Sequence, residues 1–354
     1  MKIKSIRVYE KENAPKLLEV EAENGLKGYS ELCCPFAFYA IGLIRDKLIG
    51  RSIYNTESME LLFNCHDNGP ISKALGAVQA AMWDIFGKKV GQPVYNILGG
   101  KMDRPIPLAA TGWDKDCVTP EEYAAAAKAV VAKGYKVIKF NPLHNIPFET
   151  LDFHRLIMTP AVEAVKAVKE AVGPDVQIQL DLNHEIDHDQ TMALFKEIED
   201  MNIYTVANPC CYGDFAGEYK LAQTFDQPMQ DGAGAASVLE LDLYVEKGDV
   251  TTVEYDVNTV GGICEARYIA VNAEAYYRRT AHTYKNFGGF AANIVIAAVS
   301  PNLNRLDINV PDFEEALKTW KFCHEIKDGM LYLNDAAAGL GIEPDLTGYK
   351  EVLA

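Results

Sequence analysis

The chain lacks a basic surplus, a membrane-length apolar run and any leader-like start. It has 34 Lys and Arg against 50 Asp and Glu, a net charge of -16. That balance argues against nucleic-acid binding, which requires basic patches. No stretch reaches the length of a membrane span, and residues 1–6 contain no apolar run typical of a signal peptide. We therefore expect a cytoplasmic protein without nucleic-acid or membrane partners.

Two further motifs are missing. The eight cysteines include no CxxC, and the pairs Cys33–Cys34 and Cys210–Cys211 are adjacent. Neighbouring cysteines rarely form a relaxed disulfide, which favours free thiols in a reducing compartment. No GxGxxG follows the first strand-like segment, so a dinucleotide-binding domain is not expected.

The sequence does contain enough apolar residues for a large core. Hydrophobic residues make up 49% of 354 positions, which suits an α/β barrel with an added domain. Residues 4–9 and 17–22 alternate as strands do, with an Asn24–Gly25 turn signal after them. A helical pattern then covers 73–87. We expect an N-terminal α+β domain over 1–104, to which residues 330–354 return.

From residue 105 the pattern alternates between strands and helices. Short apolar runs recur at intervals of roughly 25 to 40 residues, each followed by a helix-like segment. This repeat predicts a parallel barrel over 105–329, in preference to an open doubly wound sheet. The predicted strands are 107–111, 137–141, 176–181, 204–207, 229–231, 252–256 and 280–282.

Polar residues close several of these strands, at the face where barrels keep their chemistry. Asp256 and His282 end successive strands, so we predict that Asp256 orients His282 as a general base or acid. The alternative is a bridge that only ties two loops. Lys139 either acts on the substrate or forms a structural ion pair with Asp181 on the next strand.

A divalent metal would require more oxygen ligands than one carboxylate. Asp181 is the secure candidate, and Asn183 points the same way along the strand. Asn208 and Asp231 are candidate helpers that would complete a rebuilt magnesium site.

Several segments together resemble the enolase superfamily, in particular its mandelate racemase and acid-sugar (galactonate-type) dehydratase branch. The matching segments are 74–84, 91–95 with 98–100, 256–266 and 339–343. The resemblance covers nearly the whole chain. It implies a modified TIM barrel, (β/α)7β, under an N-terminal α+β capping domain. It also implies homo-oligomers and magnesium-assisted removal of a proton beside a carboxylate.

The resemblance assigns roles to individual residues. Asp181 matches the first magnesium ligand, and Asp256 and His282 match a catalytic dyad. Lys139 matches the first lysine of a Lys-x-Lys strand, where Asn141 replaces the second lysine. The residues expected to bind substrate are Asn141, Asn183, Asn208 and Trp113.

The chain departs from the family at two magnesium ligands. Ala207 and Ala233 stand where glutamates are expected, so a degenerate magnesium site is predicted. The leading expectation is a divergent dehydratase that eliminates water from, or epimerises, a small polyhydroxy carboxylate. The alternatives are a non-catalytic protein that binds a sugar acid or serves in assembly, and a metal-independent lyase.

Overall fold

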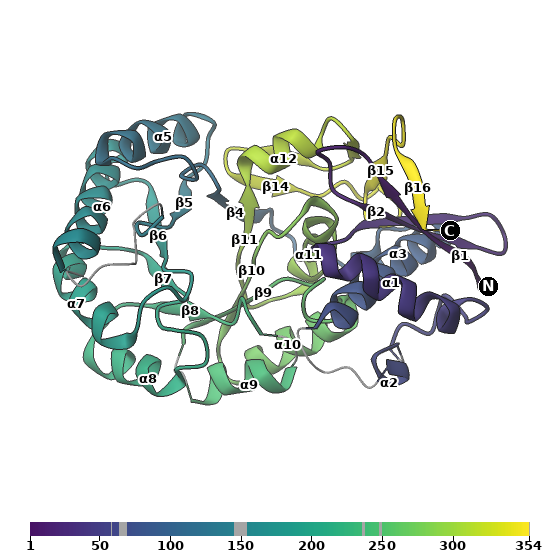
Figure 1. Cartoon of the computed structure of the whole chain (residues 1–354), viewed down its shortest axis with the longest axis horizontal. Coiled ribbons are helices and arrows are strands. Elements are labelled where there is room, and N and C mark those ends of the chain that lie inside the picture. Colours follow the sequence, from purple (N-terminus) through teal and green to yellow (C-terminus); the bar gives the residue numbers. More distant parts are fainter. Residues whose placement is uncertain (58, 64–68, 145–153, 236–237, 248–249, 354) are drawn as a thin grey trace.

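The computed structural model describes residues 1–57, 59–63, 69–144, 154–235, 238–247 and 250–353. Its centre is a closed barrel of eight parallel strands, in which β11 pairs with β4 (Figure 1). The (β/α) barrel expected from the sequence is thus confirmed. The barrel strands are β4 (Ile106–Thr111), β5 (Val137–Phe140), β6 (Gln177–Asp181), β7 (Thr205–Ala207), β8 (Met229–Asp231), β9 (Thr252–Tyr255), β10 (Arg279–His282) and β11 (Leu303–Asn309).

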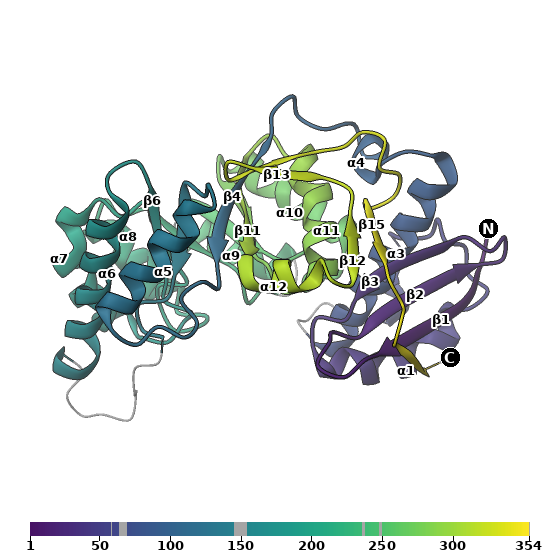
Figure 2. The same ribbon diagram turned by 90° about the horizontal axis from the view of Figure 1, so that it is seen from above.

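Helices follow the strands and cover the outside of the barrel (Figures 1 and 2). Two of them begin with a capping box, in which Thr119 and Asp187 accept backbone N–H groups of the first turn. The outer helices are α5 (Pro120–Ala132), α6 (Thr159–Val172), α7 (His188–Ile198), α8 (Phe215–Thr224), α9 (Val238–Glu246), α10 (Ile263–Ala275), α11 (Phe287–Val299) and α12 (Val310–Ala316), with short η1 (His154–Met158) and η2 (Glu199–Met201).

Strand β11 was not among the strands predicted from the sequence. Its register with β4 pairs Asp307 with Ala109, and its register with β10 pairs Arg305 with Ala281. Arg305 and Asp307 are both buried. Charged residues alternating along a strand are typical of a solvent-exposed face, whereas here they lie within the barrel. The strand was missed because its polar face is the buried one.

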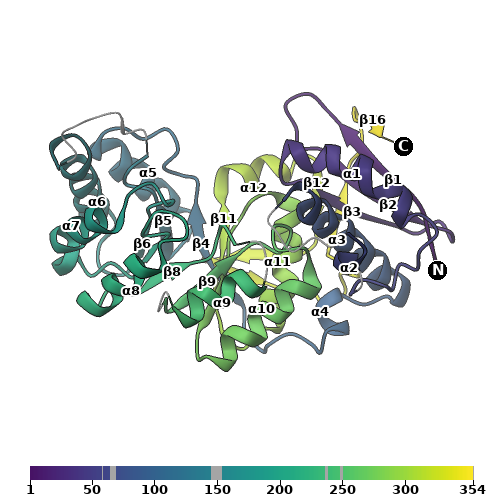
Figure 3. The ribbon, with the colours of Figure 1, turned by 60° about the horizontal axis from the view of Figure 1, so that its bottom comes forward.

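Three N-terminal strands and the C-terminal strand β16 (Lys350–Leu353) form a four-stranded antiparallel sheet in the order β16-β1-β2-β3 (Figure 2). Helices α1 and α3 contact each other and lie beside it (Figure 3). Helix α3 is longer than predicted and ends at Gly91, whose positive φ provides the left-handed cap. The elements are β1 (Ile3–Glu10), β2 (Leu17–Ala22), β3 (Lys27–Glu31), α1 (Pro35–Leu48), α2 (Met59–Phe63), α3 (Pro70–Val90) and α4 (Val94–Ile97).

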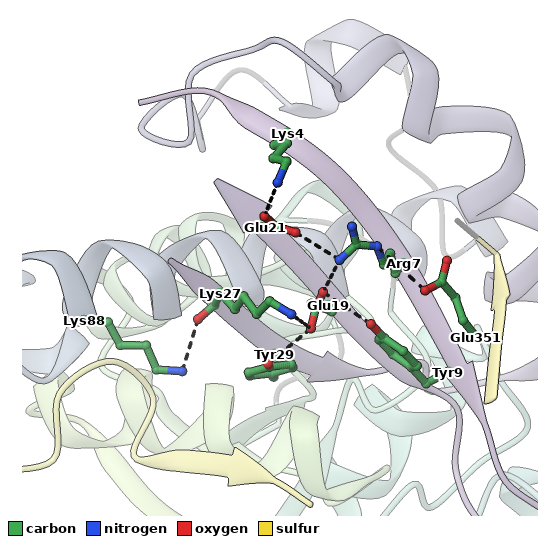
Figure 4. A network of polar contacts seen from close by, with 9 residues as sticks. All are labelled: Lys4, Arg7, Tyr9, Glu19, Glu21, Lys27, Tyr29, Lys88 and Glu351. Atoms are coloured by element: carbon green, nitrogen blue, oxygen red, sulfur yellow. Dashed lines mark hydrogen bonds and ion pairs between the residues drawn. The ribbon is translucent and has the colours of Figure 1, made fainter. Parts of the chain in front are cut away.

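A polar network crosses the capping sheet (Figure 4). The Glu19 carboxylate is fully buried and accepts hydrogen bonds from Arg7 at 2.9 Å and Lys27 at 2.9 Å. Tyr29 donates its hydroxyl to the same carboxylate at 3.2 Å. Because these donors come from β1 and β3, on either side of Glu19 in β2, the buried charge ties the three strands together.

The C-terminal residues contact both domains. Strand β14 (Met330–Tyr332) pairs with β4 of the barrel and with β13 (Glu325–Lys327), whereas β16 (Lys350–Leu353) pairs with β1. Strands β12 (Trp320–Phe322) and β15 (Ile342–Pro344) pair with each other. The tail therefore links the barrel to the capping sheet. Among the described residues, no helix is both long and apolar enough to cross a membrane.

The packing of β3 on α3 predicts the effect of a single methyl group. A Cβ at Gly28 would overlap the carbonyl oxygen of Ala81, which is helix backbone that cannot swing aside. We expect Gly28→Ala to lower the free energy of unfolding by about 1–3 kcal/mol in urea denaturation. Gly42→Ala, an exposed position in α1 with open space around it, is the control. It should be neutral or stabilise by about 0.5–1 kcal/mol, and equal effects of the two changes would contradict the packing argument.

Candidate active site

A cavity of about 430 Å³ opens at the carboxyl ends of the barrel strands. This is the face at which barrels of this kind place their chemistry. Most residues that line the cavity are polar, and their side chains include carboxylates, amides, hydroxyls, amines and imidazoles. The lining residues used below are Asp114, Lys139, Asn141, His144, Asp181, Asn183, His184, Asn208, Ala233, Thr283, Lys285 and Asp307.

Lys139 lies at the floor of this cavity, with only 3% of the residue exposed. Its Nζ atom lies 3.1 Å from Asp181 Oδ2, 2.5 Å from Glu254 Oε1 and 3.0 Å from Asp307 Oδ2. An ammonium group has three N–H donors. Each of them therefore has a carboxylate partner. The geometry favours the structural ion pair over a Lys139 side chain that is free to act on a substrate.

Glutamine side chains extend the hydrogen bonding around the carboxylates that contact Lys139. Gln230 donates to Glu254 Oε2 at 2.9 Å, and Gln179 donates to Gln230 at 3.3 Å. Burial raises the pKa of Glu254, and the ammonium of Lys139 opposes that shift. The same carboxylates, led by that of Asp181, hold the pKa of Lys139 well above its ordinary value against the cost of burial. Lys139 is therefore a fixed cation.

Both carboxylate oxygens of Asp181 have partners within the protein. Its Oδ2 contacts Lys139, and its Oδ1 accepts from Asn208 Nδ2 at 2.7 Å and from the Asn183 backbone N–H at 3.0 Å. Despite burial, the Lys139 charge and these donors hold the pKa of Asp181 below its usual value. The carboxylate is charged, and donors within the protein contact both of its oxygens.

The donor set does not fit a magnesium ion, which prefers six oxygen ligands. Asp181 pairs in register with Ala207, whose methyl group adds no ligand, and Ala233 lines the cavity without an oxygen-bearing side chain. Asn208 donates its N–H to Asp181, which leaves one amide oxygen on this side chain and no carboxylate. Within the described ranges no group of three His, Cys, Asp or Glu residues is placed to hold a metal.

Asp231, predicted as a metal helper, faces away from the cavity. Its register partner is Val253, and its neighbour Gln230 takes the inward position. Asp231 is buried with Glu218, and its Oδ1 lies 3.6 Å from His184 Nε2. Burial raises the pKa of Asp231 well above its usual range and that of Glu218 to about 7. Because side chains alternate along a strand, that of Asp231 lies on the outer face of β8. The prediction that Asp231 helps to bind a metal is therefore wrong.

The predicted pairing of His282 with Asp256 is absent. His282 pairs in register with Tyr255, so it lies on the Tyr255 face of the sheet, opposite the face of Glu254 and Asp256. Its ring packs edge-on against Tyr255 at 4.7 Å, and neither ring nitrogen has a partner among the described residues. Burial lowers the pKa of His282 to about 3. His282 is a neutral core residue in this structure.

The Asp256 carboxylate instead accepts hydrogen bonds from the loop that follows it and from α11. Its carboxylate accepts from Asn293 Nδ2 at 2.9 Å and from the backbone N–H groups of Asn258 at 2.9 Å and Thr259 at 3.3 Å. Burial raises its pKa, while the Asn293 hydrogen bond and the charge of Lys285 oppose the shift. Asp256 thus shapes the turn before α10.

Of the predicted substrate-binding residues, Asn141, Asn183 and Asn208 line the cavity. The side-chain amides of Asn141 and Asn183 both donate to Glu185, at 3.2 and 3.0 Å, which orients them together. Trp113 does not line the cavity. Its indole N–H donates to the Ala110 carbonyl at 3.1 Å, and its ring packs on Phe140.

The cavity also contains groups that the sequence analysis did not select. His144 lies three residues after Asn141 and lines the cavity, and the buried Asp114 accepts the Asn141 backbone N–H at 2.9 Å. Lys285 and Thr283 follow β10 on the cavity side. They were missed because strand tips alone were considered. Polar residues one to three positions beyond each tip would have indicated them.

The fold and the mouth cavity define a class, a barrel with an N-terminal cap as in the enolase superfamily. Residues 122–348 match the family model described as enolase C-terminal domain-like. Residues 10–99 match the model for the mandelate racemase / muconate lactonizing enzyme N-terminal domain. The chain belongs to this mandelate racemase and muconate lactonizing enzyme family of the enolase superfamily.

Curated relatives include dehydratases and a racemase. A D-gluconate dehydratase of Thermoproteus tenax is 31% identical over 251 residues, 70% of this chain but 49% of the relative. A D-gluconate/D-galactonate dehydratase of Picrophilus torridus is 24% identical and covers 97% of this chain and 92% of its own. An N-succinyl-L-Arg/Lys racemase of Bacillus cereus is 24% identical over 73% of this chain and 69% of its own.

Solved structures share the fold at lower identity. An enolase-superfamily member from Salmonella Typhimurium has a TM-score of 0.89 at 22% identity, with 100% of this chain and 99% of that chain covered. An enolase protein from a Sargasso Sea environmental genome has a TM-score of 0.87 at 20% identity over 100% and 99% of the two chains. Likeness at this identity establishes architecture only.

The burial of neutral His282 predicts a pH dependence. Its folded pKa is about 3, against an ordinary 6.5, so the unfolded chain binds the extra proton between these values. The neutral form of His282 therefore contributes its full share to the free energy of unfolding above pH 6.5. This share is lost as the pH falls towards 3, by about 1.4 kcal/mol per pH unit. We expect His282→Phe to flatten the acid side of a stability profile measured by urea denaturation. If stability depends on pH in the same way in the variant and the wild type, folding does not lower the pKa of His282.

Proposed function

We propose that the mouth cavity binds a small polyhydroxy carboxylate, an acid sugar, and that the protein eliminates water from it without a divalent metal. One observation carries the proposal: the cavity combines amine, amide, hydroxyl and imidazole groups, while the oxygens of Asp181 are engaged by other side chains. The names of the dehydratase relatives agree with this substrate class.

The lining groups divide into two sets by chemistry. Lys115 and Lys285 bring positive charge to the cavity, which suits the substrate carboxylate. The oriented amides of Asn141 and Asn183, and the Thr283 hydroxyl, suit the sugar hydroxyls. The Thr283 Oγ1 atom is buried and has no hydrogen-bond partner among the described residues, so it can accept from or donate to a ligand.

Proton transfer is assigned to His144. It is an imidazole that lines the cavity, and imidazole is the side chain that most often serves as a general base near neutral pH. His144 would take the proton from the carbon beside the carboxylate. The electron pair would form the new double bond as the hydroxyl on the next carbon leaves, and the imidazolium would return its proton to that hydroxyl to release water. In this assignment Lys139, Asp256 and His282 have structural roles.

A second function, binding without turnover, is favoured by one specific feature. The buried Lys139 ammonium already contacts three carboxylates, so it offers little to a developing enolate. Enolisation beside a carboxylate concentrates negative charge, which a metal ion would otherwise offset. Homo-oligomers and a cytoplasmic location remain predictions under either function.

Ligand binding is tested with Lys285→Met. We expect D-gluconate or D-galactonate to raise the Tm of the wild type, and the variant to bind about 10-fold or more weakly because a charged hydrogen-bond donor is lost. Binding is measured by calorimetry and thermal shift. Lys321→Met, which removes an exposed lysine that does not line the cavity, should bind as the wild type does. Failure of every acid sugar in a broad panel would refute the substrate class.

Catalysis is tested separately with His144→Gln. We expect kcat for dehydration to fall by about 10²- to 10⁴-fold while ligand binding persists, and EDTA to leave wild-type turnover unchanged. His188→Gln, which alters a histidine that does not line the cavity, is the control. Loss of activity in His282→Asn but not in His144→Gln would restore the dyad predicted from the sequence. Acid-sugar binding without turnover would favour the second function.

A further inference from the structure

A second cavity, of about 370 Å³, opens at the amino-terminal ends of the barrel strands, opposite the mouth. Residues at or next to the first positions of β7, β8, β9, β10 and β11 line this basal cavity. Among the lining residues that the structure describes there is no Asp or Glu, so an anion would meet no fixed negative charge on this wall. The polar lining residues used below are Tyr204, Thr252, Arg279 and Asn304.

Arg279 lies on the inner face of the barrel, at its amino-terminal end. In the pairing of β10 with β9, Arg279 stands in register with Thr252. The next residue on this face, Ala281, pairs with Glu254, which contacts Lys139 inside the barrel. Because alternate residues of a strand share a face, Arg279 belongs to the inner face of β10. The residue is exposed at that end, and in the described part of the chain no carboxylate forms an ion pair with it.

Arg305 lies deeper on the same inner face, in register with Ala281 and with only 3% of the residue exposed. Its guanidinium packs over the ring of Tyr204, 4.2 Å from the ring centroid, and its Nη2 donates to Asn304 Oδ1 at 3.3 Å. The Nε and Nη1 atoms have no hydrogen-bond partner within the described ranges. Because Tyr204 and Asn304 both line the basal cavity, Arg305 adjoins that cavity from the barrel interior.

The positive charges at this end of the barrel are only partly offset. Burial lowers the pKa of Arg305 from its ordinary value, and the charge of Arg279 lowers it further. Tyr204 and Asp307 oppose that shift, but the Asp307 carboxylate also contacts Lys139, at 3.0 Å. Two arginines therefore depend on one carboxylate that a third cation shares. Charges interact strongly in the barrel interior, where water screens them little, so an anion beside Arg279 would relieve the repulsion.

Hydrogen bonds hold the lining around these charges in place. Asn304 Oδ1 accepts from the Tyr204 hydroxyl at 3.2 Å as well as from Arg305. Asn304 Nδ2 donates to Thr252 Oγ1 at 3.4 Å, so the Thr252 hydroxyl keeps its own hydrogen for a further acceptor. Arg278 also lines the cavity, although it is already in contact with another group. The wall thus places a hydroxyl donor next to Arg279, which suits an oxyanion.

We propose that the basal cavity binds a phosphate group, held by Arg279 and the Thr252 hydroxyl, with Arg305 as a buried positive charge behind them. Guanidinium groups match the geometry of phosphate, and a dianion gains from both arginines. Arg305 acts through its charge, because its unpartnered nitrogens are buried. The volume leaves room for a small organic group, so the source is either free phosphate or a small phosphorylated metabolite. This site goes beyond the proposed dehydration and does not depend on it.

The first test is calorimetric titration of the wild type with inorganic phosphate at constant ionic strength. We expect saturable binding at millimolar phosphate and a rise in Tm that KCl does not reproduce. Arg279→Ala should bind phosphate about 10-fold or more weakly, because a charged hydrogen-bond donor is lost. Arg279 is exposed, so its removal leaves the fold intact. A wild type that binds no phosphate would refute the proposal.

Arg267→Ala is the matched control. Arg267 is an exposed arginine of the neighbouring helix α10 that does not line the basal cavity, and its removal should leave phosphate affinity unchanged. Equal weakening in Arg267→Ala and Arg279→Ala would mean that phosphate binds only as a general counterion, which would overturn the proposal. Arg305→Met tests the buried charge, and we expect it to weaken phosphate binding by about 3-fold or more. Unchanged affinity in that variant would contradict the role given to Arg305.

A cross-comparison with the mouth separates the two cavities. Lys285→Met should leave phosphate binding unchanged, and Arg279→Ala should leave D-gluconate binding unchanged. Loss of phosphate binding in Lys285→Met but not in Arg279→Ala would place the anion in the mouth and refute the basal site. D-glucose 6-phosphate distinguishes the two sources: tighter binding than phosphate indicates a phosphorylated metabolite, and equal binding indicates phosphate itself. Because the readout is phosphate affinity, failure of the proposed dehydration would leave it unaffected.

Discussion

Charge compensation inside the barrel is the constraint on which the site depends. Lys139 holds Asp181, Glu254 and Asp307 together, and glutamines extend the polar contacts across the axis through Gln230 and Gln179. The barrel of this chain is therefore stabilised internally by ionic contacts between strands as well as by apolar packing. The mouth above it is shaped by side chains that this cation has already oriented, Asp181 first among them.

The consequence for chemistry is a change in where positive charge resides. In the arrangement implied by the family resemblance, a metal ion sits in the mouth and meets the substrate directly. In this chain the central cation is covalently attached and saturated, while the charges at the cavity wall belong to Lys115 and Lys285. The proposed metal-free function therefore relies on positive charge that belongs to the cavity wall.

The sequence predicts the barrel and several of its tip residues because apolar runs and their polar ends repeat along the chain. The ion pair between Lys139 and Asp181 is predicted from neighbouring strands for the same reason. Two features of the site depend on how neighbouring strands align. A local sequence pattern does not contain that alignment. The inward charges of β11 invert the expected alternation, and the register of β10 with β9 places His282 beside Tyr255 rather than Asp256. His144 and Lys285 lie on loops beyond the tips, where position depends on tertiary packing.

The pairing of β16 with β1 joins residues from opposite ends of the chain. The first strand is flanked on one side by β2, a neighbour in sequence, and on the other by a strand that begins at Lys350. During synthesis that outer edge of β1 remains unpaired until every strand of the barrel has been made. Completion of the cap is thus a late event with a long loop to close, and an emerging chain presents an open β-edge to which other nascent copies can pair.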